Sequence, residues 1–566
     1  MSSLPKTTEQ LTAWTWPQIE PFYKQLQAQP LSAGNGPGWL SEWSRLSEHV
    51  SEMGQRLYVA TMVNTADADA EKRFKAFLDD IQPAAETAEQ KLREKLLASG
   101  LEPKGFEIPL RNMRSEAALF RAANLPLLTQ EAKLSNEYDK IIGAQTADWD
   151  GKEVTLTQLM PVYQEADRVR REKAWRLAAK RRLADRAAIN ELWATFLSLR
   201  RAIAANADFG DDYRAYRWKS MLRFDYTPDD CKSFHRAIEQ VVVPVATRIY
   251  ARRRARLGVS SLRPWDLEVD PLGRSPLRPF ERVGRLTRRT SSIFHRVDPR
   301  LGECFDVMVN EGLLDLENRR NKAPGGYCTD FLARKRPFIF MNAVGMHNDV
   351  QTLLHEGGHA FHVFEMRALP YVQQLSVGME FAEVASMGME LLAAPYLAEA
   401  NGGFYSKDDA ARALAEHLEK SILFWPYMAV VDAFQHWVYE NPQAALDAAN
   451  CDAAWARQLQ RFMPGLDYGG LEQEMMTGWQ NKLHIHEIPF YYVEYGLAQL
   501  GAVQVWRNAL RDQAGAVASY RRALALGGTV PLPELYATAG ARFAFDAATL
   551  SSCVSLMEET IEKLGA

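Results

Sequence analysis

The sequence predicts a mostly α-helical protein, and three observations support this fold class. Apolar residues recur at helical spacing in several long segments. Segments with the pattern of a strand are few. The composition, with 47% hydrophobic and 24% charged residues in a chain of 566, is typical of a folded globular protein rather than a disordered or collagen-like one.

The helical pattern is clearest over residues 189–203, where apolar side chains follow one another at intervals of three and four. The same spacing occurs at 74–81 and at 414–423. The clearest strand signal is the apolar run Phe338–Met341, which follows Pro337. We therefore expect amphipathic helices in the first three segments and a short strand at 338–341.

Charge and cysteine content argue against several classes of function. Lys and Arg number 67 against 71 Asp and Glu, a net charge of −4, which disfavours a general binder of polyanions. The arginine-rich stretch 252–289 is predicted to be a solvated surface with loops. The alternative, a nucleic-acid-binding patch, predicts binding that weakens steeply with salt. The five cysteines are far apart and include no C-x-x-C pair, so neither disulfides nor a cysteine-ligated metal is expected.

The chain carries no pattern of a targeting or membrane-spanning segment. The first 19 residues include Lys6 and Glu9 and have neither a long apolar core nor a small-residue cleavage site. No run of 18 apolar residues occurs, and the nearest candidate, Tyr491–Trp506, is interrupted by three polar residues. We expect a cytoplasmic protein with no membrane partner.

The segment Asn348–His362, with the pattern H-E-x-x-H, carries the most chemical information. His355 and His359 are four residues apart on one face of a predicted helix, so both imidazoles can reach a single tetrahedral zinc ion. Glu356 lies about 100° further round the helix, away from the ion but close to a water bound there. A general base is needed at that position in a zinc-dependent hydrolase.

The same segment predicts its own helix boundaries and a close contact. Asn348, followed three residues later by Gln351, is expected to cap the helix, and Leu369-Pro370 is expected to stop it. Gly357 and Gly358 each cost about 1 kcal/mol relative to Ala inside a helix. A merely structural surface helix is the alternative, but glycines would be unusual choices there, and such small residues allow something to approach the helix closely.

A catalytic zinc site needs a third protein ligand and keeps one open position. His362 is seven residues from the first histidine, roughly 10 Å along the helix axis, so we expect it to be packed or to support another ligand. The next acidic helix, 379–390, offers Glu380, Glu383 and Glu390. Spacing alone does not choose among them. A glutamate that is not a ligand is expected to accept a hydrogen bond from a ligand histidine or to be solvated.

Several segments together resemble the thimet oligopeptidase and oligoendopeptidase F family of zinc metallopeptidases, the oligoendopeptidase F branch more closely. They are Phe338–Asn342, Asn348–His362, Phe381–Ser386 and Trp479–Ala502, the last containing the run PFYYVEY. The resemblance extends over the carboxy-terminal half. The amino-terminal part is similar only in being helical and of suitable length. We divide the chain into an N-terminal helical region, 1–190, and a zinc metallopeptidase region, 191–566.

This resemblance implies a fold and a ligand set. Glu383 is the implied third zinc ligand, with one Zn²⁺ per chain, and Glu356 the implied catalytic base. The implied fold is a two-lobed helical shell around a deep channel, with a small β element lining the cleft, which admits short peptides. The family commonly has a bulky residue where this sequence has Gly357.

The resemblance also implies groups that stabilise the charge on the peptide oxygen during cleavage. His484, Tyr491 and Tyr495 are the candidates, because an N–H or O–H aimed at that oxygen lowers the barrier. Tyr492 and His486 are alternatives, since the two branches of the family align differently here. The alternative for any single tyrosine is a core aromatic residue.

The expected function is a zinc-dependent endopeptidase that hydrolyses internal bonds of short peptides bound along the edge of strand 338–341. One alternative is a dipeptidyl carboxypeptidase or carboxypeptidase-like trimming enzyme, which would need a group such as an arginine to hold the terminal carboxylate. Another is a non-catalytic, metal-containing peptide-binding protein. Short peptides are the expected partners, and the sequence leaves the oligomeric state open.

Overall fold

The computed structural model describes residues 4–565 of the chain. Helices form most of it and short strands form two small sheets, which confirms the predicted mostly α-helical class. The chain divides into two compact units of three segments each. The first unit comprises Met1–Ala118, Leu277–Ala413 and Ala498–Phe543, and the second comprises Leu119–Pro276, Leu414–Leu497 and Ala544–Ala566.

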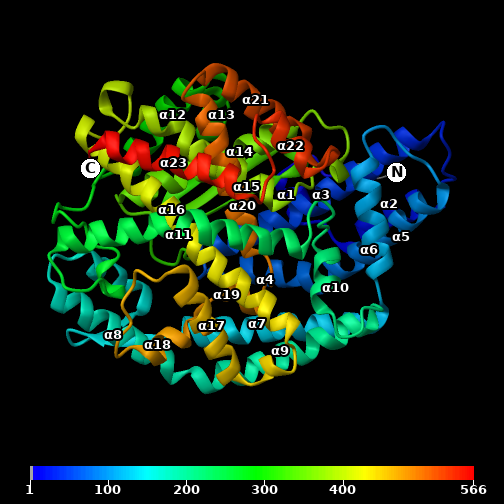
Figure 1. Ribbon diagram of the computed structural model, residues 1–566. Helices are drawn as coiled ribbons and strands as arrows, with labels where there is room; N and C mark the ends of the chain where they lie inside the picture. Colours follow the sequence, from blue (N-terminus) through cyan, green and yellow to red (C-terminus); the bar gives the residue numbers. More distant parts are fainter. Residues whose placement is uncertain (1–3, 566) are drawn as a thin grey trace. The chain divides into compact units, whose positions relative to one another are not determined.

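Figure 1 shows the elements in the order of the chain. The α-helices of the first unit are α1 (Thr8–Thr12), α2 (Trp16–Ala28), α3 (Gly36–Val63), α4 (Ala68–Ala76), α5 (Gln82–Ser99), α12 (Val283–Val297), α13 (Pro299–Asn310), α14 (His347–Met366), α15 (Met379–Ala393), α21 (Gln513–Leu526) and α22 (Leu532–Thr538). Those of the second unit are α7 (Leu125–Gly143), α8 (Arg168–Ala184), α9 (Arg186–Asn206), α10 (Tyr213–Ser220), α11 (Pro228–Leu257), α17 (Ala448–Phe462), α18 (Glu472–Met476), α19 (Leu483–His486) and α23 (Ala547–Leu564). Residues of both units occur in α6 (Glu107–Leu119), α16 (Lys407–Glu440) and α20 (Tyr492–Ala509).

The helices expected from apolar spacing are present, with one local difference. The regularly spaced apolar residues of 189–203 lie in α9, and those of 414–423 lie in α16. Segment 74–81 does not form one regular helix, because α4 ends at Ala76 and a wider π-helical turn covers Phe77–Ile81. Between residues 4 and 565, no helix combines the length and the apolar character needed to cross a bilayer.

A three-stranded sheet in the first unit has the order β3-β5-β4. The strands are β3 (Leu314–Glu317), β4 (Tyr327–Phe331) and β5 (Arg336–Ala343); β1 (Thr146–Trp149) and β2 (Lys152–Thr155) form a separate hairpin in the second unit. β3 runs parallel to β5, and β4 runs antiparallel to it with Tyr327 opposite Phe340. The predicted strand 338–341 is therefore part of the central strand of its sheet.

The two faces of this sheet pack against different helices because strand side chains alternate between faces. On one face, Tyr327 stacks on Phe340 at 5.1 Å between ring centres and also contacts Tyr58 of α3 at 5.9 Å. On the same face, Thr329 donates a hydrogen bond to Gln55 of α3 at 2.9 Å. Contacts between α14 and both β4 and β5 cover the other face.

Candidate active site

The helix that carries the H-E-x-x-H pattern starts slightly earlier than predicted. α14 begins at His347, so Asn348 is already inside the helix and does not cap it. Asp349 takes that role, because its Oδ2 accepts the backbone N–H groups of Val344 and Met346, both at 2.8 Å. A carboxylate is favourable at a helix N-terminus, where free N–H groups point outward. The predicted Asn348–Gln351 cap is therefore wrong.

The two glycines of α14 allow two close contacts. A Cβ atom on Gly358 would lie 2.3 Å from the carbonyl oxygen of Ala385 in α15, and a Cβ atom on Gly357 would lie 2.5 Å from the ring of Phe294 in α12. Neither contact is possible for a larger residue without displacement. Phe294 thus fills the space beside Gly357.

Close packing of α14 on α15 (Figure 1) brings together three metal-binding side chains, His355, His359 and Glu383, which we call the His-Glu cluster. One ligand atom from each lies within 4.8 Å of the other two. Oε2 of Glu383 is 3.3 Å from Nε2 of His355 and 3.7 Å from Nε2 of His359. Donors around a tetrahedral zinc ion, with bonds of about 2.0–2.1 Å, are separated by about 3.4 Å. The donor types and their spacing therefore fit a zinc ion.

Neighbouring side chains hold two members of the His-Glu cluster in place. Nδ1 of His355 is 2.7 Å from Oε1 of Glu390, which fixes the ring so that Nε2 faces Glu383. The hydroxyl of Ser386 donates to Oε2 of Glu383 at 2.8 Å. Ser386 had no signal in the sequence, although it lies one helical turn after Glu383.

Glu356 is buried beside the His-Glu cluster, on the side of α14 that meets the sheet. Burial raises the pKa of Glu356 to about 7, with a further contribution from the charge of Glu383, while the charge of His355 and the backbone N–H of Cys328 oppose the rise. The carboxylate thus lies next to both the cluster and strand β4. The proximity of Cys328 could not be predicted from sequence, since it depends on which strand lies at the edge.

The other candidates on these helices lie outside the cluster. Glu380 is buried, and its backbone carbonyl accepts the hydroxyl of Tyr536 at 2.9 Å. His362 is buried with its ring 6.2 Å from that of Phe381, and burial lowers its pKa to about 3. His362 therefore lies in a packed, apolar environment.

The aromatic candidates of the carboxy-terminal segment lie together in the second unit. The ring of His484 is 6.0 Å from Tyr491, 4.8 Å from Tyr492 and 6.0 Å from Tyr495. Tyr491 and Tyr495 are half-buried, whereas Tyr492 is buried. Burial, assisted by the charge of Lys482, lowers the pKa of His484 to about 4, so the imidazole is neutral at pH 7. We call His484, Tyr491 and Tyr495 the His-Tyr cluster.

His486, the alternative to His484, has a different environment. Its ring stacks on Tyr138 at 4.3 Å and on Trp479 at 5.8 Å, and the residue is fully buried. Burial lowers the pKa of His486 to about 3. The structure therefore places His486 in the core of the second unit and His484 beside the tyrosines.

A strained residue precedes the tyrosines. Phe490 has φ = 67°, in the left-handed region that a bulky side chain rarely adopts. Its N–H donates to Oε1 of Gln435 at 2.8 Å, and its carbonyl accepts from Arg223 at 2.6 Å. These bonds hold the turn from which Tyr491 extends, and strain of this kind commonly occurs at functional sites.

A second group of possible metal ligands lies in the second unit but does not suit a metal. Cys231, Asp432 and His436 lie close together and are buried. Nη1 of Arg214 is 3.2 Å from Nδ1 of His436. Arginine can only donate, so Nδ1 of His436 accepts this hydrogen bond, and a proton on the ring belongs to Nε2, the atom that faces Asp432. A nitrogen that carries a proton cannot bind a metal.

The edge of strand 338–341 is not available to a peptide, contrary to our expectation. β5 pairs with β3 on one side and with β4 on the other. Among the residues that the structure describes, β4 pairs only with β5, so β4 has a free edge. β4 is also the strand that contains Cys328, next to Glu356.

Two family models match this chain. The model described as peptidase family M3 matches residues 162–555, and that of the peptidase M3 N-terminal domain matches residues 9–113. The first match covers more than half of the chain. The chain belongs to peptidase family M3. Membership thus extends to the amino-terminal residues, where sequence motifs had shown only a helical pattern.

Solved structures agree with membership of the M3 family. PZ peptidase A, solved with an inhibitor, is 28% identical, with a TM-score of 0.86 over 100% of this chain and 98% of that chain. A protein assigned as oligoendopeptidase F is 28% identical, with a TM-score of 0.86 over 99% and 98% of the two chains. Another from Bacillus anthracis str. Ames is 25% identical, with a TM-score of 0.83 over 97% and 96%. No curated protein matched the chain.

Proposed function

We propose that this M3-family chain is a zinc-dependent endopeptidase that hydrolyses internal bonds of short peptides. The observation that carries the proposal is the convergence of His355, His359 and Glu383 at distances that suit one zinc ion, with Glu356 next to them. These three residues would hold the ion. Bound zinc supplies Lewis-acid chemistry, which activates water and withdraws charge from a carbonyl oxygen.

The carboxylate of Glu356 moves the proton in this proposal. It accepts a proton from the attacking water and returns it to the leaving amine. Its place beside the His-Glu cluster, without being one of the three donors, supports this role. Glu390 and Ser386 position His355 and Glu383 through the hydrogen bonds described above.

The free edge of β4 is the proposed binding place for the peptide backbone. An extended peptide that adds to a sheet edge gains hydrogen bonds that do not depend on its side chains, which suits broad specificity. The position of Cys328 beside Glu356 supports β4 rather than β5. The peptide bond next to Cys328 would then lie close to the base.

The His-Tyr cluster is proposed to stabilise the negative charge that develops on the peptide oxygen. His484 is neutral and can donate an N–H, and the half-buried Tyr491 and Tyr495 can donate an O–H. Tyr492 and His486 are less suitable, because both are buried among aromatic rings.

Hydrolysis of an internally quenched peptide of about ten residues tests the proposal. We expect cleavage at an internal bond that stops with a chelator and returns with zinc, with the cleaved bond identified by mass spectrometry. Amidated and free-acid versions of the peptide should be cleaved at the same bond. Removal of fixed lengths from the free acid alone would indicate a carboxypeptidase-like enzyme instead. No cleavage of a varied peptide set by the zinc-loaded protein would indicate a peptide-binding protein.

A further inference from the structure

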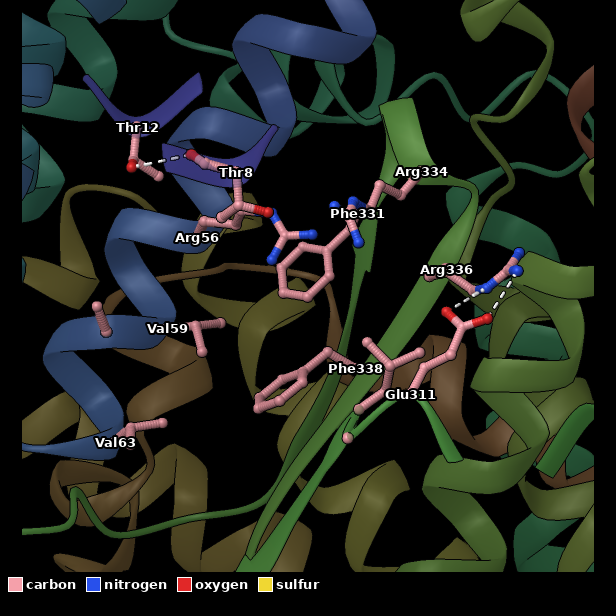
Figure 2. Close-up of a pocket in the computed structure, with 13 residues that line it drawn as sticks. Thr8, Thr12, Arg56, Val59, Val63, Glu311, Phe331, Arg334, Arg336 and Phe338 are labelled. Atoms are coloured by element: carbon pink, nitrogen blue, oxygen red, sulfur yellow. Dashed lines mark hydrogen bonds and ion pairs between the residues drawn. The ribbon is translucent and has the colours of Figure 1, made fainter. Parts of the chain in front are cut away.

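A cavity of about 820 Å³ lies in the first unit and is lined by residues of α1, α3, β4 and β5 (Figure 2). It lies on the sheet face that packs against α3, whereas the His-Glu cluster belongs to α14 and α15, and none of the cavity residues belongs to that cluster. Its volume is within the range of about 300–1,000 Å³ that is usual for small-molecule sites. The proposed peptidase function does not use this cavity.

The cavity has an apolar wall. Val59 and Val63 of α3 face Phe331 and Phe338 of the sheet, and Leu313 completes this surface. Four of these residues are buried and Val63 is half-buried. An apolar ligand group that covers them releases water from both surfaces, which favours binding.

A fixed guanidinium group stands beside the apolar wall. Nε of Arg56 donates to Oε1 of the buried Glu52 at 2.7 Å, and the guanidinium carbon is 3.9 Å from the ring centre of Phe331. The Arg56 side chain is only 16% exposed. Of the three nitrogens of the Arg56 guanidinium, only Nε has a hydrogen-bond acceptor among residues 4–565. Both NH₂ groups are therefore available.

A second guanidinium group with free donors comes from the turn between β4 and β5. The backbone N–H of Arg334 donates to Glu52 at 2.9 Å, but the guanidinium has no acceptor within the described chain. Figure 2 shows Arg56 and Arg334 extending towards one another beside Phe331. Arg336, in contrast, is occupied by two hydrogen bonds to Glu311, at 2.8 and 2.9 Å.

The acidic groups near these arginines leave room for one more anion. Glu52 and Glu311 are each engaged with an arginine, and Glu9 is exposed to solvent. A carboxylate between Arg56 and Arg334 would find unused N–H donors on both side chains, and guanidinium groups bind carboxylates through such donors. A cation would be repelled by both guanidinium groups, and a neutral acceptor would lack the attraction between opposite charges that strengthens these hydrogen bonds.

We propose that this cavity binds a small organic anion in which a carboxylate is joined to an apolar chain. The carboxylate accepts hydrogen bonds from Arg56 and Arg334, and the apolar chain covers Val59, Val63 and Phe338. This inference does not depend on the proposed peptidase function, because the site is separate from the His-Glu cluster.

Isothermal titration calorimetry of the full-length chain with decanoate tests this inference. The protein is first stripped of metal with a chelator, since a zinc ion can also bind carboxylates. We expect saturable binding at one site per chain. Arg334→Gln should weaken it about tenfold or more, because a hydrogen bond to a charged group is lost. The control Arg320→Gln, an exposed arginine outside the cavity, should stay within about twofold.

A second variant and two further ligands complete the test. Val63→Trp should fill the cavity and abolish decanoate binding, and decyltrimethylammonium should not bind. The inference is overturned if decanoate shows no saturable binding up to about 1 mM. Unchanged affinity in both Arg334→Gln and Val63→Trp, or equal binding of the cation, also overturns it. Decyl phosphate separates the two headgroups: binding of the phosphate alone overturns the assignment of a carboxylate.

Discussion

Glu356 lies beside the His-Glu cluster and next to the backbone of β4, where a carboxylate can exchange a proton with water. We expect Glu356→Gln to lower kcat for the quenched peptide by at least about 100-fold, since a general base contributes roughly 10²–10⁴-fold. Zinc content should be unchanged, because the three proposed ligands remain. Activity near that of the wild type in a zinc-loaded Glu356→Gln protein would contradict the proposed role.

Glu390 provides a second test at the scale of single residues. Removing its carboxylate with Glu390→Leu leaves Nδ1 of His355 without an acceptor, so the ring is no longer held. We expect zinc affinity to fall about 10- to 100-fold, measured by competition with a chelating dye. Glu390→Gln is the matched control, because its amide oxygen can still accept the hydrogen bond. Equal zinc affinity in the wild type and Glu390→Leu would argue against the positioning role.

At the scale of elements, the contact of α14 with α15 depends on one glycine. A Cβ atom in Gly358→Ala would lie 2.3 Å from the oxygen of Ala385 and 2.6 Å from Cα of Ser386, so the helices must separate. We expect a loss of about 1–3 kcal/mol in the free energy of unfolding, measured with urea, and weaker zinc binding because Glu383 moves with α15.

Gly388 in α15 is the matched control for Gly358. A Cβ atom there meets nothing closer than 3.6 Å, the ring of Tyr520. Gly388→Ala should leave stability unchanged or raise it by up to about 1 kcal/mol, because Ala favours the helix. Equal destabilisation by both substitutions would show that helix interior position, rather than the close approach, sets the cost.

The strands show why element type was easier to predict than element position. The apolar run 338–341 correctly indicated a strand. Its pairing was predicted wrongly, because a free edge depends on β3 and β4, which lie elsewhere in the sequence and have weak strand patterns. A buried central strand and a half-buried edge strand cannot be distinguished from a run of four apolar residues.

At the scale of the whole molecule, zinc should stabilise the chain, since the His-Glu cluster is assembled only when α14 and α15 are packed. At about 100 times its dissociation constant, an ion that binds only the folded state contributes about 2.7 kcal/mol. We expect the Tm of the chelator-treated protein to rise by several degrees on addition of zinc, measured by calorimetry. The same rise in a His359→Phe variant would contradict binding at this cluster.

Family membership is also a property of the whole chain. The motifs that carried the resemblance lie in the carboxy-terminal half, yet the family matches include residues 9–113. Amphipathic helices such as α2 and α3 vary freely in sequence as long as their apolar faces are kept, so single motifs do not reveal them. Similarity over the full length of known structures is a stronger signal than any one of these helices.

The sequence by itself determined the helical class and the placement of His355, Glu356 and His359 on one helix, because periodicity and spacing along a helix are local properties. Spacing did not choose which glutamate meets these histidines; the family resemblance implied Glu383, and the tertiary structure places Glu383 beside them. Glu383 joins the cluster, Glu390 holds His355, and Glu380 lies elsewhere, although all three share one helix. The physical reason is that contacts between elements depend on packing, here on the close approach that Gly358 allows.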